Sequence, residues 1–178
     1  MEALFRDGLL AGQVIVTAGP CDGVGEYLAA LGSQPHPLEL GDDEDAARKV
    51  AEEIVAAAGG RIDTLVVDGA AAGGPPEGID RVWIAIRAVA TVAMIEGERG
   101  GKVVILAQGP DQRAHAEATR SALENVARTL SIEWARFGIR LTAIAPGAGD
   151  AQESIAALVA YLASPAGEYF SGSRLSLA

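Results

Sequence analysis

The sequence has little of several residue types on which whole classes of protein depend. Only one of its 178 residues is cysteine, and only 4% are aromatic. The single cysteine, Cys21, excludes an internal disulfide and fits a reducing compartment, so we expect a cytoplasmic protein. With so few aromatics the core must be built from Ala, Val, Ile and Leu, which favours close helix–sheet packing over large ligand cages.

Basic residues and long apolar stretches are also scarce. The 14 basic residues are outnumbered by 24 acidic ones, for a formal net charge of -10. No cluster of Lys and Arg is present, which excludes nucleic acid as a partner. The N-terminal stretch MEALFRDGLLAG lacks the apolar run of a secretory signal. The most apolar helical stretch, 82–95, contains Arg87 and is too short to cross a bilayer. We therefore expect one soluble domain over residues 1–178.

Short apolar runs rich in β-branched residues predict the strands of a buried parallel sheet. Each run is continuous rather than alternating, as in strands that are covered on both faces. The four strongest runs lie at 13–17, 64–67, 102–106 and 139–144, and two weaker ones at 37–40 and 173–177.

Helical segments separate these runs. They extend from Asp42 or Asp43 to Gly59, from about 79 to 98, from about 113 to 137 and from about 151 to 163. The acidic residues at 39–45 are interpreted as the capped start of a helix on a solvated face, not as a metal site. Strands alternating with helices predict an α/β fold, a Rossmann-like doubly wound parallel sheet in three layers.

A glycine-rich turn follows the first strand. Its glycines, Gly19, Gly23 and Gly25, are spaced as G-x-x-x-G-x-G before a short helix. Such a loop lets backbone N–H groups approach a pyrophosphate, but glycines also serve tight turns that need positive φ. Asp22 lies inside the loop and would repel a phosphate. A dinucleotide site also needs a group that holds the adenosine ribose, and the stretch 33–40 offers His36 as its only ring.

Taken in order, several motifs resemble the short-chain dehydrogenase/reductase family along nearly the whole chain, most closely its 3-oxoacyl-acyl-carrier-protein reductase-like branch. The matching stretches are 19–25, 60–67, 101–106, 121–130 with Glu133, 137–140, 143–147 and 155–165 with Gly172. The resemblance implies a Rossmann fold, with NAD(P) held at Gly19, Gly23 and Gly25 if those positions have kept their role.

The resemblance also implies a catalytic Ser, Tyr and Lys, usually with an Asn. Aligning on Ser121 puts Arg120 at the Lys position and Ala116 at the Tyr position. The Ser position falls on Ala107 or Gln108, and the Asn position on Ala85 or Ile86. The usual Asn-Asn-Ala-Gly motif reads Val-Asp-Gly-Ala at 67–70. We therefore expect all four catalytic groups to be lost.

Two segments of the family layout are expected to be missing. The strand at 37–40 aligns with the family's third strand, which leaves no second strand and no following helix to hold the adenosine. After Gly149 the chain enters its last helix directly, which leaves no room for the family's lid over the substrate. Both losses affect ligand sites and spare the core strands.

The helices that begin near Ile79 and Arg113 keep their small and apolar residues. The second carries a stripe of small residues at helical spacing: Ala114, Ala118, Ser121, Ala122, Asn125 and Thr129. In the family, the equivalent helices form a four-helix dimer interface. We therefore expect a homo-oligomer, or a hetero-oligomer with a related complete dehydrogenase/reductase.

Three functions are open. The sequence favours a catalytically degenerate member that binds no cofactor and acts as a non-catalytic scaffold or partner subunit. The alternative is an NAD(P)-dependent oxidoreductase acting on a carbonyl or hydroxyl group with a rearranged site that uses Gln108, His115 or Arg120. His115 can transfer a proton, but it lies one residue before the Tyr position. The third is a nucleotide or small-molecule sensor. No metal site is expected.

Overall fold

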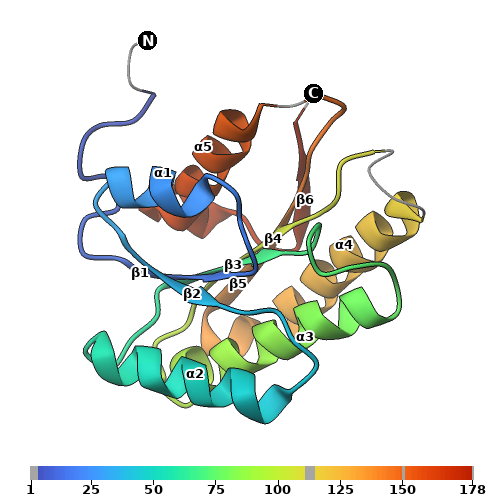
Figure 1. Ribbon diagram of the computed structural model, residues 1–178. Coiled ribbons are helices and arrows are strands. Elements are labelled where there is room, and N and C mark those ends of the chain that lie inside the picture. Colours follow the sequence, from blue (N-terminus) through green and yellow to red (C-terminus); the bar gives the residue numbers. More distant parts are fainter. Residues whose placement is uncertain (1–3, 111–114, 150, 178) are drawn as a thin grey trace.

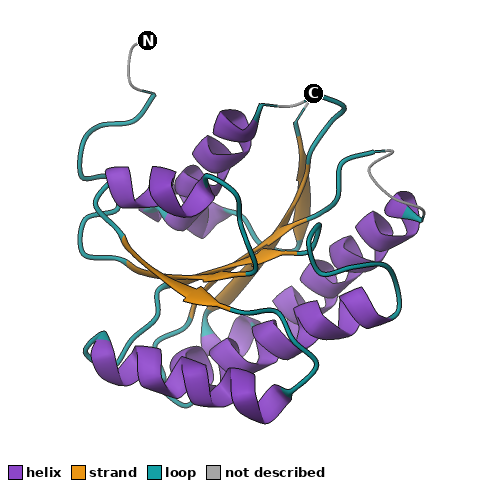
Figure 2. Ribbon diagram, in the orientation of Figure 1, coloured by secondary structure: helices purple, strands orange, loops and turns teal. Residues whose placement is uncertain are grey.

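The computed structural model describes residues 4–110, 115–149 and 151–177, which form a parallel sheet with helices on both faces (Figures 1 and 2). Its strand order is β2-β1-β3-β4-β5-β6. The strands are β1 Val14–Ala18, β2 Gln34–Leu38, β3 Thr64–Asp68, β4 Gly101–Leu106, β5 Ile139–Ala145 and β6 Ser173–Ser176. The α-helices are α1 Val24–Ala30, α2 Glu44–Ala57, α3 Glu77–Val89, α4 Ala116–Glu133 and α5 Gln152–Ala163. The predicted fold class is confirmed.

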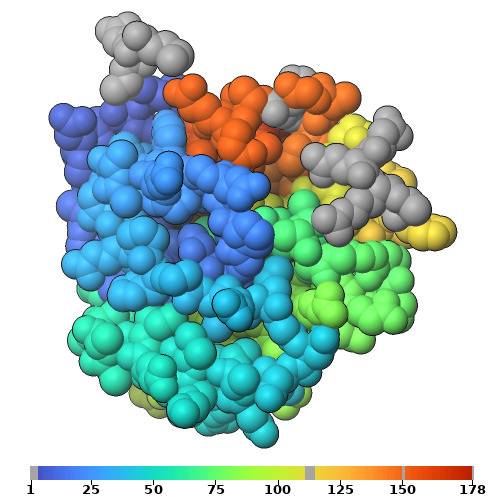
Figure 3. Space-filling view, in the orientation of Figure 1, coloured from blue at the N-terminus to red at the C-terminus, as the bar shows by residue number. Residues whose placement is uncertain are grey.

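Two aliphatic cores lie on the two faces of the sheet. One core, between the sheet and α2, α3 and α4, contains Val16 and Leu65. The other, between the sheet and α1 and α5, contains Ile15 and Val66. Neighbouring residues of a strand point to opposite faces, which is why continuous apolar runs mark strands buried on both sides. Helices α1 and α5 pack against each other over the second core (Figures 1 and 3).

The helix predictions hold with changes at the ends. The helix predicted at 79–98 is α3 followed by a π-helical segment, Ala90–Ile95. Helix α4 begins at Ala116, while the predicted start at Arg113 lies outside the described residues. Helix α2 is capped as predicted, because the Asp43 carboxylate accepts the Ala46 N–H at 3.0 Å.

The strand beside β1 corrects the prediction that the family's second strand is missing. Strand β2 begins three residues earlier than expected and pairs with β1 in parallel, from Val14 opposite Gln34 to Ala18 opposite Leu38. The usual doubly wound order, 3-2-1-4-5-6, has one further strand outside the second. Here β2 is itself the edge of the described sheet. The shortening therefore removes an outer strand and leaves a strand in place next to the glycine loop.

Candidate functional site

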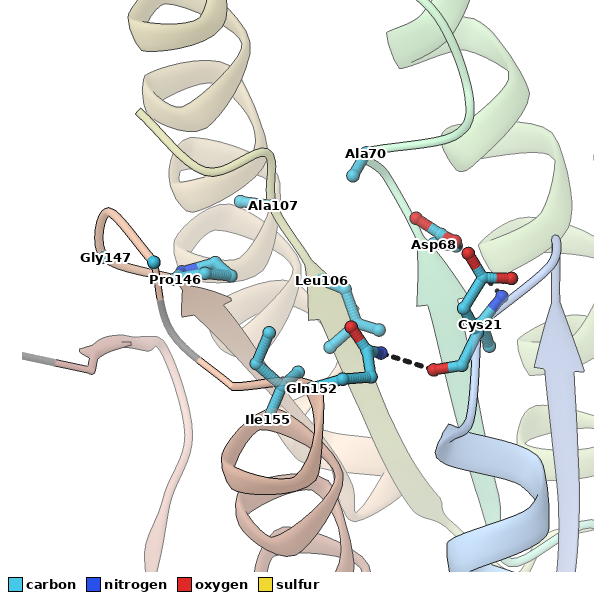
Figure 4. A pocket seen from close by; sticks show the side chains of 11 residues that line it. Cys21, Asp68, Ala70, Leu106, Ala107, Pro146, Gly147, Gln152 and Ile155 are labelled. Carbon is cyan, nitrogen blue, oxygen red and sulfur yellow. Dashed lines mark hydrogen bonds between the residues drawn. The ribbon is translucent and has the colours of Figure 1, made fainter. Parts of the chain in front are cut away.

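A cavity of about 300 Å³ lies where β1, β3, β4 and β5 end (Figure 4). In doubly wound folds, ligands bind at this edge, at the point where the strand order reverses. The order reverses here between β1 and β3. The lining of the cavity comes from the loop after β1, from the ends of β3 and β4 with the residues that follow them, from the β5–α5 connection, and from α5. These segments contribute, in that order, Cys21 and Asp22, Asp68, Ala107, Pro146 and Gly147, and Gln152.

The three glycines of the loop at 19–25, the glycine loop, differ in what they do for the chain. Gly19 and Gly23 have positive φ, +92° and +68°. A Cβ at Gly19 would lie 2.9 Å from Leu40 Cδ1 and 3.0 Å from Asp68 Cβ. Gly25 has no positive φ, and a Cβ there would meet nothing within 4 Å. The turn therefore explains the first two glycines, and the third leaves open space above the start of α1.

Asp68 ties the glycine loop to the end of β3. Its carboxylate accepts the N–H of Cys21 at 3.1 Å and the N–H of Ala71 at 2.9 Å. Gly69 follows it because a Cβ there would lie 2.8 Å from the Leu106 carbonyl oxygen. The Val-Asp-Gly-Ala variant at 67–70 thus places a buried carboxylate that fixes the loop backbone.

The cavity is acidic on the glycine-loop side. Burial, together with the nearby carboxylates of Asp68 and Asp22, raises the pKa of the Cys21 thiol to about 12. The thiol is therefore neutral at physiological pH and is no nucleophile. Asp22 keeps the predicted place inside the loop, as part of the cavity wall.

Gln152 closes one side of the cavity (Figure 4). This residue begins α5, and its side-chain Nε2 donates to the backbone oxygen of Asp22. The bond joins two segments far apart in the sequence. Strand β5 ends at Ala145, so the connection to α5 is short, as expected for a chain without the family's lid segment.

The predicted catalytic positions Gln108 and Arg120 come together at the ends of β4 and β5. One guanidinium nitrogen of Arg120, Nη1, donates to the carbonyl oxygens of Gln108 and Pro146, both at 2.8 Å. The Gln108 amide nitrogen donates to the Gly73 carbonyl at 3.3 Å, and its oxygen is buried without a donor among the described residues. Arg120 thus links the ends of β4 and β5.

Ala116 and His115 stand at the start of α4. Ala116 is buried and offers only a methyl group. His115 is exposed and precedes the helix with φ +64°, and its carbonyl accepts the Thr119 hydroxyl at 3.2 Å. Within the described chain its ring makes no hydrogen bond, and no cluster of His, Cys, Asp and Glu could hold a metal ion. The equivalence of Ala116 to the family's Tyr, and of Arg120 to its Lys, stays a prediction.

The structure places Glu39 beside the glycine loop, a position that the sequence reasoning did not single out. It follows β2 directly, and both its neighbours contact Gly19: the Leu38 carbonyl accepts the Gly19 N–H at 2.8 Å, and the Leu40 side chain lies against it. An acid about 20 residues after the first loop glycine hydrogen-bonds the ribose 2′-hydroxyl in Rossmann sites. The spacing was visible in the sequence, but its meaning depended on β2 lying beside β1.

Comparison with known proteins finds relatives that are named as oxidoreductases. No protein-family profile matches the chain. It is 27% identical over 164 residues to an uncharacterized NAD-dependent oxidoreductase of Mycobacterium tuberculosis, an alignment that covers 79% of this chain and 59% of that protein. It is 28% identical over 159 residues to a galactitol 2-dehydrogenase of Rhizobium johnstonii, covering 76% and 62%. The chain thus spans about three fifths of the length of these relatives.

Solved structures share the fold. A citronellol catabolism dehydrogenase of Pseudomonas aeruginosa superposes with a TM-score of 0.80 at 24% identity, covering 99% of this chain and 98% of the other. A short-chain dehydrogenase/reductase of Serratia marcescens, a double mutant, gives 0.75 at 20% identity, covering 94% and 96%. No helix in the described chain is long and apolar enough to span a membrane. The fold is that of solved short-chain dehydrogenases/reductases, and the motif order and the relatives agree with the resemblance to that family.

Proposed function

We propose that the chain is an NAD-dependent oxidoreductase that acts on a hydroxyl or carbonyl substrate, the alternative of the sequence analysis. The observation that carries this proposal is the open space above Gly25, because neither backbone conformation nor packing in this chain needs a glycine there. A glycine in a helix costs about 0.5–1 kcal/mol relative to alanine. Close approach of the protein backbone to a bound ligand is a physical reason to keep this glycine. The names of the relatives support the same reading over a non-catalytic subunit that binds no cofactor.

The residues present fit a dinucleotide at the glycine loop and favour NAD over NADP. Glu39 is exposed beside Gly19, so its carboxylate would accept a ribose hydroxyl and repel a 2′-phosphate. A nearby cation does not change this, because Arg81 is held by the Asp42 carboxylate at 2.8 and 3.1 Å. The bound nicotinamide would supply the hydride acceptor or donor.

In this proposal the proton is transferred by His115. Arg120 keeps a fixed positive charge and cannot titrate in the role of a lysine. Its contribution is positional, since it holds the ends of β4 and β5 through the Gln108 and Pro146 carbonyls. Gln108 is buried and donates to the Gly73 carbonyl, so it supports the site without touching the substrate. His115 is the member of this set whose exposed imidazole can accept or donate a proton.

Calorimetric titration with NADH and NADPH tests the binding site. We expect NADH to bind more tightly than NADPH, and Glu39→Ala to narrow the difference. Gly25→Val should weaken NADH binding at least about tenfold without lowering the melting temperature, since its side chain would enter open space. Gly74→Val is the matched control, because Gly74 also has no positive φ and no neighbour within 4 Å. Unchanged NADH binding by Gly25→Val would contradict the proposal.

A non-catalytic partner subunit is the second candidate. It is favoured by Arg120, whose Nη1 is already committed to two backbone carbonyls, and by Ala116, which has no group to move a proton. Turnover assays with secondary alcohols and ketones separate the two functions. Turnover that disappears in His115→Ala supports the oxidoreductase. Absence of both NADH binding and turnover, together with co-purification of a complete relative, supports the partner subunit. NADH binding with neither turnover nor a partner supports the sensor.

A further inference from the structure

A second cavity, of about 370 Å³, lies at the opposite edge of the sheet, where the strands begin. Its walls come from the residues before β1 and β3, from the first residues of β4 and β5, and from the 3-10 helix Pro165–Tyr169. Strand β4 has 6 residues, so at about 3.3 Å per residue the two cavities lie roughly 20 Å apart. This second cavity is therefore separate from the proposed cofactor site.

Cations dominate the second cavity although the whole chain is acidic. Three basic residues line it, Arg99, Lys102 and Arg140. Lys102 and Arg140 share a single carboxylate, that of Glu168, at 3.3 and 3.0 Å. Arg99 pairs with no acid anywhere in the described chain, and the Nη2 of Arg140 has no partner there either. Positive charge is thus in excess, on guanidinium groups that face the cavity.

The other acid of the cavity is already neutralised. The Asp63 carboxylate accepts the Val14 N–H at 2.8 Å and pairs with Arg61 at 3.4 Å. Beside it, the side-chain oxygen of Gln13 is buried and accepts no hydrogen bond from the described residues. A buried acceptor without a donor is unfavourable by about 1–3 kcal/mol, so a ligand that donates a hydrogen bond to this oxygen would gain affinity.

From these groups we propose that the second cavity binds a small phosphate monoester that carries a hydroxyl group. The guanidinium groups of Arg99 and Arg140 bind the phosphate, since planar forks of N–H donors match its oxygens. The hydroxyl donates to the oxygen of Gln13 once that side chain turns from its buried position toward the cavity. Lys102 adds charge, while its own protons stay on the carbonyls of Ala163 and Ser164.

Titration with glycerol 3-phosphate, followed by amide NMR, tests this site on the full chain. We expect shifts at Gly100, Gly101 and Gly138, which line the cavity, and none in the glycine loop. Arg99→Ala should weaken binding about tenfold or more. Arg128→Ala is the matched control, since Arg128 is an exposed arginine paired with Glu124 on α4. It should leave the affinity unchanged.

Sulfate separates recognition of the anionic group from recognition of the hydroxyl group. It offers the charge without a hydroxyl, so Gln13→Leu should weaken glycerol 3-phosphate and leave sulfate unaffected. Equal losses for both anions would overturn the role of Gln13. No shift at millimolar glycerol 3-phosphate, or the same loss in Arg128→Ala as in Arg99→Ala, would overturn the site. Melting temperatures of each variant show that the fold is intact.

Discussion

Among single residues, two glycines of the glycine loop are explained differently. Gly19 is required by its backbone conformation, whereas Gly25 leaves space that we propose a ligand fills. Gly19 sits at φ +92° with Leu40 and Asp68 against it, so Gly19→Ala should destabilise the protein by about 1–3 kcal/mol. Gly25→Ala should leave stability unchanged or raise it by up to about 1 kcal/mol, because the helix gains a better former and nothing is displaced. Urea unfolding of both variants measures the difference, and equal losses would contradict it.

The buried thiol of Cys21 gives a pH prediction. Its pKa is raised from 9.0 to about 12 in the folded protein by burial and by the carboxylates of Asp68 and Asp22. A raised pKa means that the folded chain holds the proton more tightly than the unfolded chain. This contribution to stability is present below pH 9.0 and is lost as the pH rises to about 12.

Unfolding free energies of wild type and Cys21→Ala from pH 8 to 11 measure that contribution as a difference, which cancels the other groups that titrate there. The loss with rising pH should be steeper in the wild type. Parallel profiles would contradict a raised pKa. Thiol reagents provide a second readout, since Cys21 should react at pH 8 only after the protein has unfolded.

Which residues were predictable depended on the range of their contacts. The Asp43 cap was visible because its partner, Ala46, lies three positions away in the sequence. The role of the Asp68 carboxylate was not visible in the sequence, because its partner, Cys21, is 47 positions away. Alignment on the family motif singles out Arg120, but its bonds to two strand-end carbonyls depend on the register of β4 and β5.

For the elements, β4 and α5 are connected by a buried lysine. Lys102 is only 9% exposed, and its ammonium donates to the carbonyls of Ala163 and Ser164 at 3.0 and 2.6 Å, at the end of α5. Lys102→Met would leave those carbonyls without a donor and should cost about 2–3 kcal/mol. Lys49→Met, on the exposed face of α2, should change stability by less than about 0.5 kcal/mol. Chemical denaturation of the pair checks this prediction.

Strand β2 shows how an edge exposed by the loss of a strand can be protected. The N–H of Gln34 bonds to Gln13 and the carbonyl of Leu38 to Gly19, so the alternate residues Pro35 and Pro37 face outward. Proline has no N–H, so this edge offers few donors to an added strand. The prolines explain why the sequence placed this strand three residues too late, since proline disfavours a strand prediction.

Replacing both prolines, as Pro35→Val with Pro37→Val, should restore outward N–H groups and cause association that increases with concentration. Sedimentation velocity measures it. His36→Val is the control, because it raises strand propensity at a position that already pairs with β1. A double variant that stays as dispersed as the control would show that the prolines do not protect the edge.

At the scale of the molecule, the main strands and the doubly wound fold class followed from the alternation of apolar runs and helices, because continuous apolar runs indicate strands buried on both faces. The position of the missing strand did not follow. Alignment with the full family layout assigns residues 37–40 to the third strand. The pairing of β2 with β1 shows instead that the shortening lies at the sheet edge, and this keeps Glu39 beside the glycine loop.

Assembly is the remaining property of the whole molecule, and we propose a dimer through α4. In this helix Ala118, Ser121, Asn125 and Thr129 are exposed, and Ile132 continues their stripe at 74% exposure. Small residues at that spacing permit close helix contact, and a large apolar side chain at its end gains from burial. The predicted Ala114 lies outside the described residues.

Light scattering after size exclusion should therefore give the mass of a dimer or a larger assembly. Ser121→Arg with Asn125→Arg should yield monomers, since two charges would have to be buried without partners at the contact. Glu53→Arg, on the exposed face of α2, changes charge as well and should leave the assembly intact. A wild-type monomer at every concentration would contradict a homodimer. A dimer that persists in the double arginine variant would place the contact on another face.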